Sequence, residues 1–325
     1  MPPPECWSQG EQQRRPAKGS GRVAVRSAES QGTSSWIVVG RLRRCGKSVA
    51  TRKMRAMPQT SVNGAELYYE IRGTGAPVLL IMGASGDGGH FDATADLLSD
   101  EFTVVTYDRR GNGRSPAPAN WKTTSPEEQA DDAAGLLAAL VRGPAVVCGT
   151  SSGAAFALCL LARHPAAVRG SILHEPPLFA FLDDLDAVRA PLRARIRSAM
   201  ETGGPEAATE PWWRYVAGED AWNKLAPDLR ERMRASSETA FGVELGSYER
   251  YLPDDATLAA VAPSVRLLVS ADGLAPYGEA ARRLGQRLGR DVETTPGTHA
   301  AYQDHPIEFA RAIRRLAREL TAIRA

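Results

Sequence analysis

From residue 61 onward the sequence alternates between short, apolar runs and stretches with helical spacing. The expected strands are, in chain order, Glu66–Ile71, Val78–Ile81, Thr103–Tyr107, Ala145–Cys148, Ser171–His174, Val265–Ser270 and Val292–Thr295. The interior runs are almost wholly apolar, as in parallel strands that are covered on both faces. The alternation therefore predicts an α/β fold with a doubly wound, mostly parallel sheet.

Two of the intervening helices carry clear start signals. Ser125 is followed by Pro126 and by Glu128 three residues on, a capping pattern with proline at the first helical position. Pro306 opens a second helix near the C-terminus. Apolar side chains recur in it every three or four residues, at Phe309, Ile313, Leu316, Leu320 and Ile323. Each helix is expected to pack one face against the sheet.

One long stretch interrupts the alternation. Residues 178–260 contain no convincing strand but several helical segments, separated by Pro191, by Gly203-Gly204-Pro205 and by Pro227. An insertion of this length between two strands predicts a helical cap, or lid, rather than a loop. The sheet core is then expected to comprise residues 57–177 and 261–325.

Residues 1–56 differ from the rest in charge. They hold 12 basic and 3 acidic residues, whereas 57–325 hold 28 and 35, so the net charge of +2 conceals a basic leader. With few large apolar residues and no helical periodicity, the leader is expected to be disordered. We expect Met54 or Met57 to be the natural first residue. The leader lacks interleaved aromatic residues, so no nucleic-acid partner is predicted.

Several other classes of function find no support in the sequence. No apolar run approaches the length of a membrane span, so no membrane partner is expected. The four cysteines lack metal-like spacing, and neither a metal nor another cofactor is predicted. Cys148 on a strand and Cys159 on a helix are expected to be buried free thiols, which favours a cytoplasmic location. The oligomeric state stays open.

The motif with the strongest chemical meaning is Gly149-Thr150-Ser151-Ser152-Gly153, which fits G-x-S-x-G. It directly follows an apolar strand and precedes 154–162, a run apolar on all sides that suits a buried helix. This strand–turn–helix setting is that of a nucleophile elbow, which exposes the central serine at the tip of a sharp turn. Ser151 is therefore predicted to be a nucleophile.

A serine hydroxyl needs a base to remove its proton, and five histidines are available. His299 lies in the polar loop that follows the strand Val292–Thr295, and a loop at the carboxyl end of a strand is where an α/β sheet places its site. His299 is the predicted base. The other histidines are His90, His164, His174 and His305; of these, His164 and His305 precede prolines at helix ends, and His174 ends a strand.

An acid should orient the histidine from a neighbouring strand end. Asp272 follows the strand Val265–Ser270, and Glu175 follows the strand Ser171–His174. Because the order Ser, Asp, His is the one associated with this motif, Asp272 is the predicted acid and Glu175 the alternative.

Taken together, these residues resemble the α/β-hydrolase superfamily, specifically its capped, esterase-like serine hydrolases. The resemblance covers 61–325 and rests on four segments: GTSSG, Ile81-Met82-Gly83-Ala84 after a strand, the DRRGNGRS stretch from Asp108, and PGTHAAYQDHPIEFARAI from Pro296. It implies that the backbone N–H groups of Ala84 and Ser152 form an oxyanion hole. It also implies that the DRRGNGRS stretch is structural and that Glu175, in a His-Glu-Pro-Pro segment, remains available as the acid.

The expected activity is hydrolysis of a carboxylic ester, lactone or thioester through an acyl-enzyme on Ser151. A cofactor-free haloperoxidase or perhydrolase, and a C–C bond hydrolase, use the same triad, so these activities stay open. A non-catalytic ligand receptor on the same fold is a further alternative. Serine rather than aspartate at the elbow argues against haloalkane dehalogenase and epoxide hydrolase chemistry.

The substrate is expected to be a small to medium apolar molecule. Four aromatic residues of the cap region are candidates for its pocket: Trp212, Trp213, Tyr215 and Trp222. The alternative is that they pack the cap helices together, and this interpretation is preferred because it is the commoner role of clustered aromatic residues. No group of arginines or lysines in the sequence converges visibly on the cap, which argues against a highly charged substrate.

Overall fold

The computed structural model describes residues 58–322; the leader 1–56, including its predicted disorder, lies outside the described residues. Eight strands form one sheet in the order β1-β2-β4-β3-β5-β6-β7-β8. The strands are β1 (Gln59–Val62), β2 (Ala65–Arg72), β3 (Ala76–Ile81), β4 (Phe102–Tyr107), β5 (Ala145–Thr150), β6 (Val168–His174), β7 (Val265–Ser270) and β8 (Val292–Thr295).

The sheet is mostly parallel, as the apolar runs predicted. The pairs from β4 through β3, β5, β6 and β7 to β8 are all parallel, whereas β2 pairs antiparallel with both β1 and β4. Every residue of the central strand β5 is buried. The short, polar β1 had no counterpart among the expected strands, because only its last residue, Val62, is buried.

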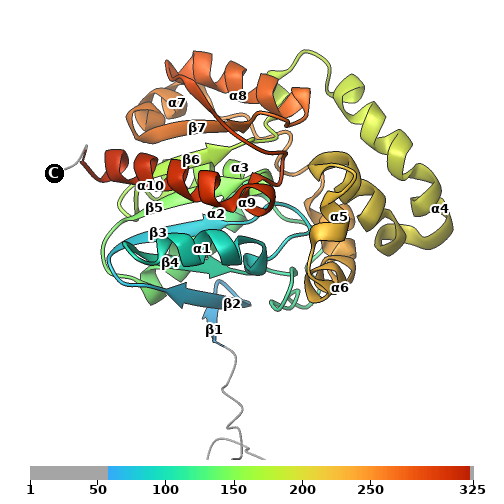
Figure 1. Cartoon of the computed structure of the whole chain (residues 1–325), viewed down its shortest axis with the longest axis horizontal. Helices are drawn as coiled ribbons and strands as arrows, with labels where there is room; N and C mark the ends of the chain where they lie inside the picture. Colours follow the sequence, from blue (N-terminus) through green and yellow to red (C-terminus); the bar gives the residue numbers. More distant parts are fainter. Residues whose placement is uncertain (1–57, 323–325) are drawn as a thin grey trace, which may run out of the picture. The chain divides into compact units, whose positions relative to one another are not determined.

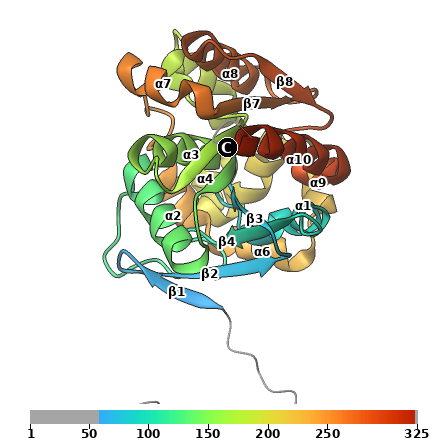
Figure 2. The ribbon, with the colours of Figure 1, turned by 90° about the vertical axis from the view of Figure 1, so that its left-hand side faces the viewer.

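Helices cover both faces of the sheet (Figure 2). On one side α2 (Pro126–Leu140) packs against α3 (Ser152–Arg163), which contacts β5 and β6. On the other side α1 (Asp92–Leu98) packs against α10 (Pro306–Ala322), which contacts β5, β6 and β8. Helix α7 (Asp255–Val261) packs on α3 and α8 (Ala275–Leu288), and α8 contacts β7 and β8.

The predicted helix signals have a visible physical basis. The Ser125 side chain accepts a hydrogen bond from the Glu128 backbone N–H, and α2 begins at Pro126. In α10 the buried positions include Phe309, Ile313 and Leu316, while Ile323 lies outside the described residues. Helix α3 buries its residues from Ser152 to Leu161, as its apolar composition predicted.

Between β6 and β7 the described chain contains helices and no strand. They are η2 (Phe179–Phe181), α4 (Leu185–Ala217), α5 (Ala221–Lys224), α6 (Pro227–Ala235), η3 (Thr239–Glu244), α7 and η4 (Ala262–Ser264). Helix α4 is kinked at Gly204, whose φ is 66°, and continues through Pro191 without a break. Helices α4, α5 and α6 gather at one side of the molecule (Figure 1).

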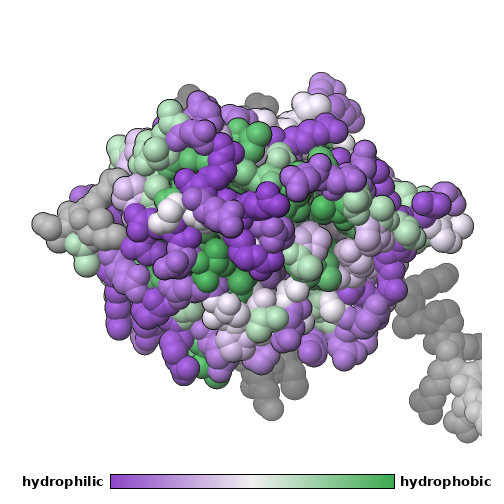
Figure 3. Space-filling view, turned by 90° about the horizontal axis from the view of Figure 1, so that it is seen from above, coloured by the Kyte–Doolittle hydropathy of each residue, from purple (hydrophilic) through white to green (hydrophobic). Residues whose placement is uncertain are grey.

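The surface seen from above Figure 1 is mostly hydrophilic, with apolar residues scattered among hydrophilic ones (Figure 3). Helix α8, the uppermost helix of Figure 1, buries one stripe that includes Ala281 and Leu284 and leaves its arginines toward solvent. No helix among residues 58–322 is long and apolar enough to cross a membrane.

Candidate active site

Ser151 occupies the sharp turn between β5 and α3. Its backbone has φ 52° and ψ −130°, a conformation that is strained for a residue with a side chain. Two backbone hydrogen bonds hold it: Ser151 N–H donates to the His174 carbonyl at 2.9 Å, and Ala154 N–H donates to the Ser151 carbonyl at 2.8 Å. The Ser151 side chain does not cap the helix, so its hydroxyl is left for other partners.

Two glycines allow this turn to be so tight. A Cβ on Gly149 would lie 2.1 Å from the carbonyl oxygen of Gly153, and a Cβ on Gly153 would lie 2.2 Å from that of Ile81. Both distances are far inside van der Waals contact, so strand and helix can pass each other only with hydrogen at these positions. The spacing of G-x-S-x-G thus follows from backbone packing.

His299 lies after β8, in the loop that the sequence predicted, and its ring is buried. Its Nδ1 is 2.5 Å from Oε2 of Glu175, which follows β6. The Tyr277 ring packs on the imidazole with a centroid distance of 4.2 Å. Because Nδ1 is engaged by the carboxylate, Nε2 is the nitrogen left to exchange a proton, and no residue of 58–322 forms a hydrogen bond with it.

Two hydrogen bonds hold the Glu175 carboxylate. Its Oε2 pairs with His299 Nδ1, and its Oε1 accepts the Ser270 backbone N–H at 3.0 Å. The carboxylate also lies so close to Gly273 that a Cβ there would be 2.0 Å from Oε1. Burial alone would raise the pKa of Glu175, but the hydrogen bond and charge of His299, helped by Ser270, lower it below its ordinary value. The carboxylate therefore stays ionised beside His299.

Asp272 is placed differently from the prediction. Its side chain is exposed and forms no hydrogen bond with another described residue, while its backbone N–H donates to the Gly297 carbonyl at 2.9 Å. The physical reason is the turn after β6. Glu175 has a left-handed φ of 47°, which carries its carboxylate across the end of β7 into the space beside His299. The geometry thus replaces Asp272 with Glu175 as the partner of His299.

His174 supports this arrangement from within the core. It is fully buried, its Nδ1 lies 2.8 Å from Thr150 Oγ1, and its Nε2 lies 2.9 Å from Ser270 Oγ. The ring stacks near His299, at a centroid distance of 6.3 Å. Burial lowers the pKa of His174 to about 4, so the ring is neutral at ordinary pH. As a neutral ring at the end of β6, His174 is hydrogen-bonded to the last residues of β5 and β7.

The two implied oxyanion donors flank Ser151. Ser152 follows it at the start of α3. Ala84 follows Gly83, whose hypothetical Cβ would lie 2.7 Å from Ser151 Cβ. No hydrogen bond among the described residues uses the backbone N–H of Ala84 or of Ser152. Two free donors beside a nucleophile could bind a developing negative charge.

A buried arginine fixes the loop that carries Ala84. Arg109 donates through Nε to the Met82 carbonyl and through Nη2 to the Gly83 carbonyl, both at 2.9 Å. It also forms a buried ion pair with Glu244 at the end of η3. Arg109 is thus structural, in keeping with what the resemblance implied for the DRRGNGRS stretch.

Ser151 opens into a cavity beneath the helical insert. The cavity is lined mainly by apolar and aromatic side chains. They come from η2, α4, the segment after η3 and the start of α8, and include Phe179, Leu192, Tyr248 and Tyr277. Tyr277 both lines this cavity and packs on His299, which places the imidazole beside the space that Ser151 faces.

The four aromatic candidates divide into two pairs. Trp212 and Tyr215 line the cavity, as one interpretation of the sequence proposed. Trp213 and Trp222 do not, and the expectation for them is corrected: Trp213 is buried against His90, and Trp222 lies beneath the Arg234 guanidinium. Helical spacing explains why Trp212 and Trp213 differ, because neighbouring residues point to different sides of α4, whereas Trp222 lies on the separate helix α5.

None of the three remaining histidines lines the cavity at Ser151. His90 is buried and contacts the Asp87 backbone, His164 ends α3 and lies 2.7 Å from Asp131, and His305 is exposed at the end of α9 (Ala301–Asp304). Cys148 and Cys159 are buried free thiols, as predicted, and burial raises the pKa of Cys148 to about 12. Within 58–322 no group of three or more His, Cys, Asp or Glu side chains could hold a metal ion.

The chain has clear relatives. A family model described as the alpha/beta hydrolase fold matches residues 76–306. An uncharacterized hydrolase, YraK, of Bacillus subtilis is 30% identical over 270 residues, covering 78% of this chain and 92% of its own. A zearalenone hydrolase of Cladophialophora bantiana is 28% identical over 272 residues, covering 82% of this chain and 97% of its own.

A similar solved structure is a thermophilic esterase from Thermogutta terrifontis. It has a TM-score of 0.64 and 26% identity, and the match covers 81% of this chain and 99% of the esterase. The matched span includes the elbow, Glu175 and His299. The chain is therefore a hydrolase that belongs to the α/β-hydrolase family.

Proposed function

We propose that the protein hydrolyses a carboxylic ester, lactone or thioester through an acyl-enzyme on Ser151. The observation that carries the proposal is the placement of Ser151. It lies on a strained turn at the wall of a largely apolar cavity, beside two backbone N–H groups that form no hydrogen bond with any residue of 58–322. The esterase likeness and the name of the zearalenone hydrolase support a small-molecule substrate.

In the proposed mechanism, Ser151 Oγ attacks the substrate carbonyl while His299 Nε2 takes the hydroxyl proton. Glu175 holds Nδ1 and stabilises the imidazolium that forms. The N–H groups of Ala84 and Ser152 bind the oxyanion of the tetrahedral intermediate. His299 returns the proton to the leaving alcohol or thiol, and water then releases the acid by the reverse route.

The cavity indicates the kind of acyl group that is accepted. Trp212, Tyr215 and Leu192 give it apolar walls, which suit a hydrocarbon or ring of modest size. The mechanism needs no metal or organic cofactor, because the residues around Ser151 supply the nucleophile, the base and the oxyanion donors. The partner that the site suits is a small molecule.

A fluorophosphonate probe together with p-nitrophenyl esters tests the mechanism. Ser151→Ala is expected to lose labelling and at least about a thousandfold in kcat, because no hydroxyl remains to form the acyl-enzyme. Ser152→Ala is the matched control. Its buried hydroxyl has no hydrogen-bond partner among the described residues, and alanine keeps the backbone N–H. Labelling or ester hydrolysis that survives in Ser151→Ala would refute the proposal.

A further inference from the structure

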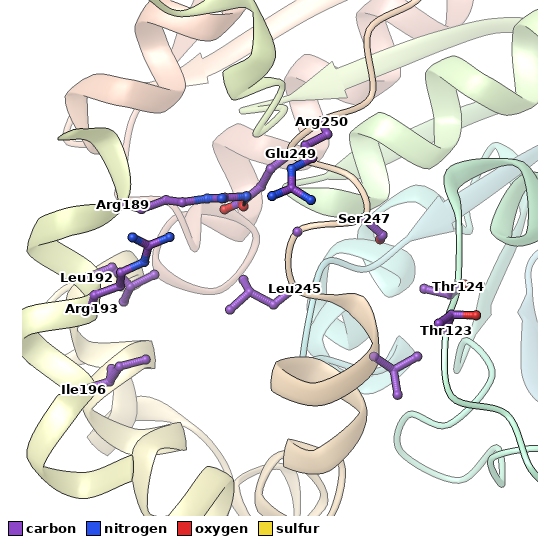
Figure 4. A pocket seen from close by; sticks show the side chains of 12 residues that line it. Thr123, Thr124, Arg189, Leu192, Arg193, Ile196, Leu245, Ser247, Glu249 and Arg250 are labelled. Atoms are coloured by element: carbon purple, nitrogen blue, oxygen red, sulfur yellow. Dashed lines mark hydrogen bonds and ion pairs between the residues drawn. The ribbon is translucent and has the colours of Figure 1, made fainter. Parts of the chain in front are cut away.

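A second cavity adjoins the one that holds Ser151. Its lining is more polar than that of the first cavity, and we call it the outer cavity (Figure 4). Four residues line both cavities: Arg189, Leu192, Leu245 and Glu249. The two spaces are therefore neighbours, separated by two leucine side chains and one ion pair.

The outer cavity carries an excess of positive charge. Arg189, Arg193 and Arg250 line it, and Glu249 is the single carboxylate among the lining residues. Arg189 pairs with the buried Glu249, so these two charges cancel. Two guanidinium groups remain, one on α4 and one on the segment opposite, and Figure 4 shows the Arg250 side chain pointing from that segment toward α4.

Both remaining arginines are available to a ligand. Arg250 has no ion-pair partner among residues 58–322. Arg193 lies 3.3 Å from Asp186, but the side chains are 57% and 84% exposed. An exposed pair of this kind contributes little and is readily exchanged for another anion. Arg193 and Arg250 are far apart in the chain, so their positions in the sequence did not predict this pair.

The arrangement of groups along the two adjoining cavities indicates what kind of substrate would fit. Ser151 lies at one end, the apolar walls of Leu192 and Leu245 lie between, and the arginines lie at the other end. A guanidinium binds an oxyanion such as a carboxylate through two parallel hydrogen bonds, so two arginines beyond an apolar path suit an acyl chain that ends in a carboxylate. The apolar walls alone would accept a plain hydrocarbon, but they would leave both charges unused.

We propose that the outer cavity is a carboxylate subsite and that the enzyme prefers acyl groups that end in a carboxylate. The substrate class is then the monoesters of dicarboxylic acids, or lactones with a distal carboxylate. Water cleaves the ester to a dicarboxylic acid and an alcohol. This inference rests on the proposed hydrolysis at Ser151 and adds Arg193 and Arg250 as residues that determine specificity.

Matched ester substrates test the preference. We would compare kcat/KM for mono-p-nitrophenyl esters of dicarboxylic acids, from succinate to suberate, with their neutral methyl-capped counterparts. The wild-type enzyme is expected to prefer the carboxylate member of at least one pair by about tenfold, which corresponds to one good ionic contact. The preference should shrink as the salt concentration rises to about 0.5 M.

Substitutions of the two arginines test whether they cause the preference for carboxylate esters. Arg193→Gln and Arg250→Gln should each lower kcat/KM for the preferred carboxylate ester by about fivefold, chiefly through KM, and leave the neutral ester within about twofold. Arg197→Gln is the matched control, since Arg197 is exposed one turn further along α4 and does not line the cavity. Equal losses on charged and neutral esters would overturn the subsite while leaving hydrolysis at Ser151 intact.

A binding measurement separates this inference from the proposed function. Calorimetry with the free dicarboxylates and the Ser151→Ala protein needs no turnover. Binding should weaken about tenfold or more when Arg193→Gln and Arg250→Gln are added together. If the two substitutions leave the dissociation constant unchanged, the proposed subsite is wrong. Arginine-dependent binding without any ester hydrolysis in the wild type would keep the subsite and refute the proposed activity.

Discussion

At the scale of single residues, Glu175 shows how a backbone angle selects a functional group. Its φ of 47° is unusual for a side chain larger than glycine, and it turns the carboxylate across the end of β7. There the carboxylate meets His299 and the Ser270 N–H, while Asp272 points to solvent. Both acids follow a strand, but only one of them faces the imidazole.

Two conservative amides test which acid orients His299. Glu175→Gln should lower kcat for p-nitrophenyl esters by about a thousandfold or more, because an amide cannot stabilise the imidazolium and can hold the wrong tautomer. Asp272→Asn should leave kcat within about twofold, since its side chain contacts no described residue by hydrogen bonding. The reverse pattern, with the larger loss at Asp272→Asn, would contradict the role proposed for Glu175.

At the scale of elements, Arg109 joins three parts of the chain that are distant in sequence. It holds the carbonyls of Met82 and Gly83 after β3, and it pairs with Glu244 at the end of η3. Asn112 also donates to Glu244 Oε1, at 2.9 Å. The loop that presents Ala84 is therefore fixed to the helical insert through one buried ion pair.

Removing one member of this pair should be costly. Glu244→Gln leaves the buried Arg109 charge without its counter-ion, and the free energy of unfolding should fall by about 3 kcal/mol. Urea denaturation measures the change. Glu279→Gln is the control: it breaks exposed ion pairs with Arg282 and Arg283 on α8, and should change stability by less than about 0.5 kcal/mol. Equal changes in the free energy of unfolding for the two substitutions would show that the buried pair contributes no more to stability than the exposed pairs do.

At the scale of the whole molecule, His174 makes stability depend on pH. The folded protein binds its proton only near pH 4, whereas the unfolded chain binds it near 6.5. Between these values the unfolded state holds more protons, so stability falls as the pH is lowered. The lowered pKa of Glu175 acts in the same direction, but its contribution is lost only below the ordinary glutamate pKa.

Urea denaturation at a series of pH values measures this dependence. The free energy of unfolding should fall between pH 6.5 and 4, with a contribution from His174 of up to about 1.4 kcal/mol per pH unit. His174→Gln should flatten the slope in this window, even if it lowers stability at every pH. His305→Gln is the control, because the His305 ring is exposed in the folded protein, whereas the His174 ring is buried. An unchanged slope in His174→Gln would refute the assignment.

The predictions that succeeded rest on local patterns. The apolar runs located seven of the eight strands, and Ser125 and Pro306 marked helix starts, because each signal is contained within a few residues. The glycines around Ser151 indicated the elbow for the same reason. His299 lies in the loop directly after β8, as predicted, because a strand and the loop that follows it can be recognised within a few residues.

The sequence by itself determined the α/β class, the positions of seven of the eight strands, and the serine and histidine that follow two of them, since periodicity and turn chemistry are local. Only the tertiary structure decided which of two strand-end carboxylates meets His299, because that depends on one left-handed turn and on the order of β6 and β7. It alone divided the cap tryptophans between cavity and packing. It also brought Arg193 and Arg250 to one cavity, since charges distant in sequence become neighbours only when α4 and the segment after η3 pack together.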